Sequence, residues 1–285
     1  MPKIRVGDLN LHYWQSGDGP DVVLVHGLGG NLAGWHLTMV PELQREYRVT
    51  TYDLRGHGRS DAPGSGYTTR DMAGDLRGLL DVLNIPHARV VGHSWGGDIV
   101  LHFALAYPHR VSELVLIEAA LLAPLAALYR REDWEGWPYV TRTFEQLLGA
   151  PIPAEKRHDL EYLVRLLIEI PIMYGPARGQ LRDEDVVMRV LEVLMPMWKG
   201  DDAGSELSVE TLARIPHSTL AIYEANSVFL AAFDALQRGL PHLASAILPG
   251  GKLKHFTGLE HPELILAHMK AFWRSGGAQT AAEAP

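Results

Sequence analysis

Apolar runs that favour β-strands alternate with helical patterns over much of the first half of the chain. The runs occupy residues 21–26, 48–53, 89–92 and 113–117. Residues 68–83 and 95–107 carry apolar side chains at helical spacing instead, with Met72, Leu76 and Leu83 on one face of the first segment. Continuous apolar strands that alternate with helices predict a parallel sheet covered on both faces.

The flanking segments extend this pattern. Residues 4–13 alternate apolar with polar positions and turn at Gly7-Asp8, which predicts an antiparallel hairpin leading into the sheet. Thr68 and Asp71 have the spacing of a capping box at the start of a helix. Strands return at residues 219–223 and 244–248, and a final helix is expected to begin at Pro262.

The alternation stops after Glu118. Between residues 121 and 215 the chain shows helical patterns, with candidates at 144–148, 160–170 and 186–194, separated by prolines. We therefore predict an α/β core at residues 1–120 and 216–274, interrupted by a helical cap domain at 121–215. Residues 275–285 are small and polar, and we expect a disordered tail.

Composition narrows the classes of function. The chain has 285 residues, 47% of them hydrophobic, which is ample for a large core. A formal net charge of −8 without a basic block argues against nucleic acid or an anionic membrane as a partner. The absence of cysteine excludes disulfides and thiol chemistry, and permits the cytoplasmic location that we expect. The N-terminus lacks the apolar core of a signal peptide. A monomer and a homodimer both remain open.

Ser94 lies in the sequence Gly92-His93-Ser94-Trp95-Gly96, between a predicted strand and a predicted helix. This context is typical of a nucleophile elbow, a sharp turn that presents a serine in a strained backbone conformation. Residues two before and two after the serine must be very small to avoid collision. Ser94 is therefore the candidate nucleophile, and a nearby histidine must act as its base.

His255 is the candidate base, because it follows the last predicted strand and precedes the final helix. Loops at the carboxyl ends of parallel strands converge on one edge of a sheet, where the elbow also lies. His261 directly precedes Pro262 and is interpreted as helix capping. The N–H of Trp95 and the N–H of Leu28, in the loop His26-Gly27-Leu28-Gly29-Gly30, are the candidate oxyanion donors.

Together these segments resemble the α/β-hydrolase superfamily, over about residues 4–120 and 216–274. The resemblance rests on His26-Gly27, the elbow, the turn at residues 52–60 and the stretch from His255 to Pro262. It implies an eight-stranded, mostly parallel sheet with a helical lid inserted after the sixth strand.

The catalytic acid departs from the common family pattern. Many members place it after the seventh strand, where this chain has Ser227. Other members place it after the sixth strand, and Glu118 occupies that position at the end of an apolar run. We therefore expect Glu118 to be the acid, with Glu224 as the alternative and Asp234 as a third candidate.

The combination of Ser94, Glu118 and His255 resembles the zearalenone lactonases of this superfamily. Their loop is similar to Leu248-Pro-Gly with the later His255-Phe, and Pro196-Met-Trp198 looks like a tryptophan segment of their lids. Haloalkane dehalogenases share the placement of the glutamate but use an aspartate nucleophile, so Ser94 argues against that chemistry.

Several further residues have structural or substrate-binding interpretations. Aromatic residues of the cap either line an apolar pocket or form the core of the cap: Trp134, Trp137, Tyr139 and Trp198. His93 is expected to support the elbow. The turn after the fourth strand is expected to be held by Asp53, Arg55, His57 and Arg59. A metal site built from His26, Asp53 and His57 is disfavoured, and no metal and no cofactor are expected.

The sequence therefore predicts a cofactor-free serine hydrolase that cleaves a small hydrophobic ester or lactone through an acyl-enzyme. Two alternatives remain open at this stage. One is hydrolysis of a carbon–carbon bond by the same triad, and the other is a ligand-sensing protein of this superfamily with weak turnover.

Overall fold

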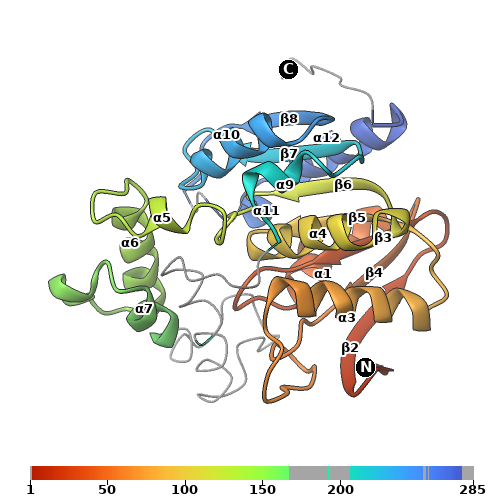
Figure 1. Cartoon of the computed structure of the whole chain (residues 1–285), viewed down its shortest axis with the longest axis horizontal. Helices are drawn as coiled ribbons and strands as arrows, with labels where there is room; N and C mark the ends of the chain where they lie inside the picture. The colour runs from red at the N-terminus through yellow and green to blue at the C-terminus, as the bar shows by residue number, and fades with distance from the viewer. Residues whose placement is uncertain (1, 167–191, 193–205, 253–254, 256, 278–285) are drawn as a thin grey trace.

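A central eight-stranded sheet organises the molecule (Figure 1). The computed structural model describes residues 2–166, 192, 206–252, 255 and 257–277. The strands are β1 (Lys3–Val6), β2 (Leu9–Ser16), β3 (Asp21–Val25), β4 (Arg48–Tyr52), β5 (Ala88–His93), β6 (Val111–Ile117), β7 (Thr219–Glu224) and β8 (Leu243–Leu248), in the spatial order β1-β2-β4-β3-β5-β6-β7-β8. Strand β2 pairs antiparallel with β1 and β4, and the other pairs are parallel. The predicted hairpin and the mostly parallel sheet are confirmed.

Helices cover both faces of the sheet. They are α1 (Leu32–Thr38), α2 (Val40–Leu43), α3 (Thr69–Val82), α4 (Trp95–Ala106), α10 (Leu230–Gly239), α11 (Thr257–Glu260) and α12 (Pro262–Arg274), with a short α9 (Val209–Leu212) before β7. The predicted capping box of α3 is present, because the Thr68 hydroxyl accepts from Asp71 N and the Asp71 carboxylate accepts from Thr68 N. Helices α1, α2 and α10 were not predicted from the sequence.

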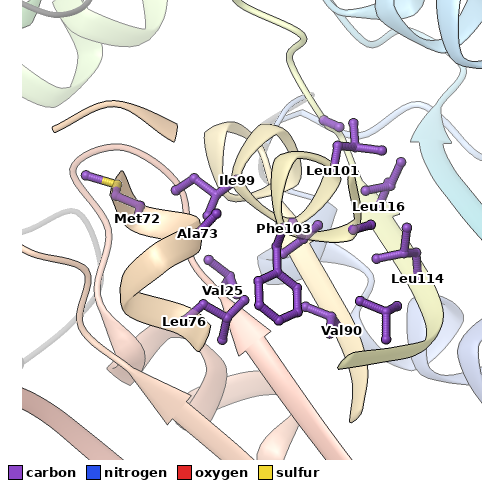
Figure 2. Close-up of a cluster of buried hydrophobic side chains, with 14 of the residues drawn as sticks. Val25, Met72, Ala73, Leu76, Val90, Ile99, Leu101, Phe103, Leu114 and Leu116 are labelled. Atoms are coloured by element: carbon purple, nitrogen blue, oxygen red, sulfur yellow. The ribbon is translucent and has the colours of Figure 1, made fainter. Parts of the chain in front are cut away.

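The core is divided into two layers by the sheet. Val23 and Val25 of β3 point into one layer, with α3, α4 and α10, whereas Val22 and Leu24 point into the other, with α1, α2 and α12. This alternation is the two-residue period of a strand that is buried on both faces. Figure 2 shows the first layer, in which Phe103 of α4 lies among side chains from β3, β5, β6 and α3.

Between β6 and β7 the chain forms a helical cap beside the sheet (Figure 1). Its described helices are α5 (Ala126–Tyr129), α6 (Trp137–Leu148) and α7 (Leu160–Leu166), and they share a separate apolar cluster centred on Trp137 and Leu163. Helix α6 is longer than the predicted 144–148, because Pro138 lies in its first turn, where proline is favourable. The predicted helix at 186–194 lies almost wholly outside the described residues.

The predicted boundaries of the cap stay a prediction. Leu121 at its start and Leu207, Leu212 and Ile215 near its end pack in the main core rather than in the cap cluster. At the C-terminus, Gly277 N donates to Phe272 O at 3.1 Å, so the described part of the tail continues the hydrogen bonding of α12.

Candidate active site

Ser94 occupies a strained turn between β5 and α4. Its backbone has φ 55° and ψ −126°, a region that residues other than glycine rarely adopt. The turn is held by two backbone hydrogen bonds, from Ser94 N to Ile117 O at 3.0 Å and from Gly97 N to Ser94 O at 2.8 Å. A Cβ atom on Gly92 would lie 2.4 Å from Gly96 O, and one on Gly96 would lie 2.4 Å from Val25 O. The two glycines are therefore required sterically, as the sequence pattern predicts.

His255 lies beside the Ser94 hydroxyl although 161 positions separate the two residues. The distance from His255 Nε2 to Ser94 Oγ is 2.8 Å, within hydrogen-bonding range. Burial lowers the pKa of His255 to about 3, so the imidazole is neutral at neutral pH and can accept the serine proton.

His93 and Phe229 hold His255 from two sides. The His93 ring stacks on the His255 ring with centroids 5.1 Å apart, and His93 Nε2 lies 3.0 Å from His255 O. The Phe229 ring meets the imidazole edge-on at 4.8 Å. Burial lowers the pKa of His93 to about 4, so the ring is neutral at neutral pH. Its Nε2 donates to His255 O only in the tautomer that carries the proton on Nε2. His93 therefore supports the position of His255 as well as the elbow.

Glu118 follows β6 and is completely buried. Its Oε2 lies 3.6 Å from His255 Nδ1. Its Oε1 accepts a hydrogen bond from Glu224 N at 2.7 Å, and its Oε2 accepts one from the Ser227 hydroxyl. Burial raises the pKa of Glu118 to about 7, and the hydrogen bonds from Ser227 and Glu224 oppose this rise because they favour the ionised form.

The alternative acids have other surroundings. The Glu224 carboxylate accepts a hydrogen bond from Gly251 N at 3.0 Å, in the segment that leads from β8 to His255. Burial also raises the pKa of Glu224. Asp234 is exposed on α10. Among the three candidates, Glu118 is the one for which the structure records an ion-pair distance to His255.

Sequence reasoning missed the contribution of Ser227. It treated this residue as an uncharged replacement for an aspartate, whereas the structure places its hydroxyl on the Glu118 carboxylate. The available signal was the position itself, because a residue that follows β7 reaches the same edge of the sheet as one that follows β6.

The loop that carries Leu28 passes directly over the elbow. A Cβ atom on Gly27 would lie 2.8 Å from Ser94 Cβ and 3.3 Å from Ser94 Oγ, so the backbone approaches Ser94 closely. Gly30 N donates to Gly27 O at 3.1 Å and closes the loop. Trp95 is the first residue of α4, with Ser94 as its N-cap, so its N–H belongs to the first turn of the helix.

Hydrogen bonds join the turn after β4 to the loop at residues 26–30. His57 Nε2 accepts a hydrogen bond from Gly29 N at 3.2 Å, and His26 Nε2 accepts one from Leu54 N at 3.0 Å. The Asp53 carboxylate accepts from Leu32 N at 2.9 Å and from Arg59 N at 2.8 Å. These side chains are thus engaged with the backbone, which agrees with a structural role and leaves neither Nε2 lone pair for a metal ion. Within the described part of the chain, no group of three or more His, Asp and Glu side chains has a metal-binding arrangement.

A further buried carboxylate, Asp98, was not singled out from the sequence. It lies in the first turn of α4 and accepts hydrogen bonds from Leu121 N at 2.8 Å and Leu122 N at 2.7 Å. Burial raises its pKa to about 7. Asp98 therefore ties the helix that follows Ser94 to the segment that follows Glu118, at the root of the cap.

The predicted cap aromatics differ in their surroundings. Trp137 is buried in the cap cluster, and its Nε1 donates to Arg131 O at 2.9 Å. Trp134 lies between Tyr129, whose ring is tilted to it, and Trp137, whose ring meets it edge to face. It lines a cavity of about 610 Å³ that also reaches Ser227. The Tyr139 hydroxyl lies 3.5 Å from His255 N. Trp198 lies outside the described residues.

The model of the α/β hydrolase fold family matches residues 20–195, more than half of the chain. The chain therefore belongs to the α/β hydrolase fold family, as its sheet order and elbow also indicate. An uncharacterized protein of Mycobacterium tuberculosis is 38% identical over 260 residues, which cover 86% of this chain and 71% of that protein. The 2-hydroxy-6-oxo-2,4-heptadienoate hydrolase of Pseudomonas putida is 41% identical over 115 residues, covering 39% of this chain and 41% of that enzyme.

Solved structures show the same fold. An N-acyl homoserine lactone degrading enzyme superposes with a TM-score of 0.69 at 24% identity, covering 95% of this chain and 100% of that one. The enol-lactonase of Burkholderia xenovorans superposes with a TM-score of 0.68 at 22% identity, covering 96% and 100%. No helix in the described ranges is long and apolar enough to cross a membrane.

Proposed function

We propose that the protein is a serine hydrolase that cleaves a hydrophobic carboxylic ester or lactone through an acyl-enzyme. The observation that carries the proposal is the continuous arrangement of Ser94, His255 and Glu118, with 2.8 Å from Oγ to Nε2 and 3.6 Å from Nδ1 to Oε2. A strained serine, a neutral imidazole and a buried carboxylate are the parts that nucleophilic acyl transfer needs.

In this mechanism Ser94 Oγ attacks the carbonyl carbon while His255 Nε2 takes its proton. The N–H groups of Leu28 and Trp95 are the proposed donors to the negative oxygen that develops. His255 then gives this proton to the alkoxide oxygen as the C–O bond breaks, which leaves an acyl-serine. The alcohol of an ester departs at this point, whereas the hydroxyl of an opened lactone stays on the acyl group. Water, activated by the same imidazole, cleaves the acyl-serine and restores the enzyme.

Glu118 has an electrostatic part in both halves of the reaction. When His255 gains a proton, the imidazolium lies 3.6 Å from a buried carboxylate that has no bulk water to screen it. A carboxylate in this position stabilises the imidazolium and keeps Nδ1–H directed away from Ser94. The long distance in the resting state is compatible with a contact that tightens as charge develops.

The substrate class is inferred from the cap and from the structural relatives. Tyr129 and Trp134 of the cap contact the Phe229 ring, with centroids 5.7 and 6.2 Å away, and the Tyr139 hydroxyl lies 3.5 Å from His255 N. Aromatic walls favour an apolar substrate. The two solved structures of lactone-degrading enzymes share the fold. The narrower hypothesis, a lactonase of the zearalenone type, rests on the placement of Glu118 and is tested by including zearalenone in a panel of lactones.

The decisive experiment is stopped-flow hydrolysis of p-nitrophenyl butyrate by the wild type and by Ser94→Ala. We expect a burst of p-nitrophenol followed by steady turnover in the wild type, and neither in the variant, since the acyl-enzyme cannot form. Circular dichroism of both proteins controls for folding. A folded wild type that turns over no ester and no lactone overturns the proposal and favours a ligand-sensing role.

Carbon–carbon bond hydrolysis is the second candidate, because the partial match to the Pseudomonas putida hydrolase favours it. Product analysis separates the two reactions. An ester releases an acid and an alcohol, and a lactone opens to a single hydroxy acid. Hydrolysis of a carbon–carbon bond beside a ketone instead releases a carboxylic acid and a ketone or its enol. Turnover of such a diketone in preference to every ester would favour the second candidate.

A further inference from the structure

Ser227 lies in the turn between β7 and α10, with 7% of its surface exposed. Its hydroxyl makes two hydrogen bonds: it donates to Glu118 Oε2 and accepts from Phe229 N at 3.0 Å. A serine hydroxyl has a single proton and two lone pairs. An ionised carboxylate can only accept, so the hydroxyl proton is directed to Glu118, while a lone pair of the same oxygen accepts from Phe229 N.

The same turn holds both oxygens of that carboxylate. Glu224 N donates to Oε1 at 2.7 Å, and the Ser227 hydroxyl donates to Oε2. Oε2 is also the oxygen that lies 3.6 Å from His255 Nδ1. Rotation of the carboxylate about its last bond would break both hydrogen bonds, so the turn fixes the plane in which Oε2 faces the imidazole.

The same turn also restricts the position of the His255 ring. Phe229, two residues after Ser227, meets the His255 ring edge-on at 4.8 Å. Residues 224–229 therefore contact the acid through two donors and the base through an aromatic edge. Glu118 itself has φ 51°, which directs its backbone into an uncommon region at the end of β6.

We propose that Ser227 is a positioning residue that orients the Glu118 carboxylate toward His255, so that the acid function belongs to the β7–α10 turn as well as to β6. This inference rests on the proposed serine-hydrolase function and deepens it. Ser227 acts through Glu118 and does not itself contact the reacting carbonyl.

The position of Ser227 also determines whether the β7–α10 turn could itself supply a carboxylate in place of Glu118. The Cγ atom of an aspartate occupies the position of a serine Oγ, and its oxygens extend about 1.2 Å further. In the variant S227D these oxygens would therefore enter the space that Glu118 Oε2 now occupies. Shortening Glu118 to asparagine, which tolerates a positive φ, would make room for them. The turn can then supply the carboxylate that β6 has lost.

The first test compares Ser227→Ala and Ser227→Thr with the wild type in kcat, KM and pH dependence. We expect kcat of the alanine variant to fall by about 10- to 100-fold, the loss of a hydrogen bond to a charged group, with KM little changed. The hydrogen bond from Ser227 lowers the pKa of Glu118. Without it the acidic limb of the rate profile should move to higher pH, and threonine should restore both properties.

Ser208→Ala is a matched control, because the Ser208 hydroxyl accepts from Thr211 N at the start of α9 and does not reach Glu118. It should lose stability without a change in kcat or in the pH profile. An alanine variant at position 227 with wild-type kcat and an unchanged profile overturns the proposal. Failure of the proposed function is seen separately, as turnover that survives Ser94→Ala.

The second test compares Glu118→Asn alone with the double variant Glu118→Asn/Ser227→Asp. We expect the double variant to recover at least about 10-fold in kcat, because the carboxylate returns to the side of His255 Nδ1. Equal melting temperatures of the single and double variants exclude recovered stability as the cause of this recovery. A double variant no more active than Glu118→Asn contradicts the geometry proposed for the turn.

Discussion

At the scale of single residues, the site depends on charges that the fold keeps out of water. Glu118 is completely buried, and its carboxylate is stabilised by Glu224 N and the Ser227 hydroxyl rather than by a cation in contact. A buried carboxylate without a permanent counter-ion costs free energy. The cost is offset when the neighbouring imidazole becomes protonated, which is the step that the proposed reaction requires.

The first prediction at this scale concerns which glutamate is the acid. Glu118→Gln should lower kcat by about 10²- to 10⁴-fold, because the amide cannot stabilise the imidazolium. Glu224→Gln is the matched control, since an amide oxygen can still accept from Gly251 N, and it should stay close to the wild type. Both variants are compared in p-nitrophenyl butyrate hydrolysis and in thermal melts. A larger loss in Glu224→Gln than in Glu118→Gln would transfer the acid role to Glu224.

At the scale of elements, the junction between β5 and α4 has no room for a Cβ atom at Gly92 or Gly96. The β5–α4 junction packs so closely that Gly96 meets two carbonyl oxygens of the β3 end, with a Cβ atom only 2.4 Å from Val25 O and 2.6 Å from His26 O. Backbone atoms cannot move aside as the end of a side chain can. The elbow and the loop that carries Leu28 are therefore one packed unit.

A pair of glycine substitutions tests this unit. Gly96→Ala should destabilise the protein by about 1–3 kcal/mol or more, since a packed region must shift, and should abolish turnover. Gly74→Ala, in α3, meets nothing within 4 Å and should stabilise it by about 0.5–1 kcal/mol, because alanine favours a helix. Urea denaturation followed by circular dichroism measures both values. Equal stability of the two variants would contradict the steric account of the elbow.

At the scale of the whole molecule, burial of many titratable groups links stability to pH. Seven histidines of the described chain have a lowered pKa: His26, His36, His57, His93, His217, His255 and His268. Among the same described residues, four carboxyl groups have a raised pKa: Asp75, Asp98, Glu118 and Glu224. For the histidines the unfolded chain binds more protons below pH 6.5, so acid favours unfolding, whereas for these four carboxyl groups acid favours the folded state.

Because the histidines outnumber the opposing carboxyl groups, we predict a lower melting temperature at pH 5 than at pH 7.5. The carboxyl group of Glu118 offsets part of this loss, since its pKa is raised to about 7 in the folded protein. Glu118→Gln removes that offset, so its melting temperature should fall more steeply over the same range. Calorimetry at the two pH values measures both slopes, and a wild type that melts higher at pH 5 would contradict the prediction.

The sequence by itself determined the order of the elements and the position of the elbow. Strand and helix periods and the glycines around Ser94 are local features, so the mostly parallel sheet could be predicted before any contact was known. It also singled out His255 and Glu118, because both follow strands whose ends meet at one edge of the sheet. Helices α1 and α2 escaped prediction because seven and four residues carry little periodicity. Helix α10 was overlooked, although Ala232, Ala235 and Leu236 give it an apolar face at helical spacing.

Only the tertiary structure decided which polar groups meet. Ser227 donates to a carboxylate 109 positions away, His57 accepts from Gly29 across 28 positions, and Asp98 accepts from Leu121 across 23. No local period encodes such pairs, because each depends on how two packed elements align at the atomic scale. The sequence thus indicated where the proposed reactive groups lie along the chain, whereas packing of the sheet edge decided how they are oriented toward one another.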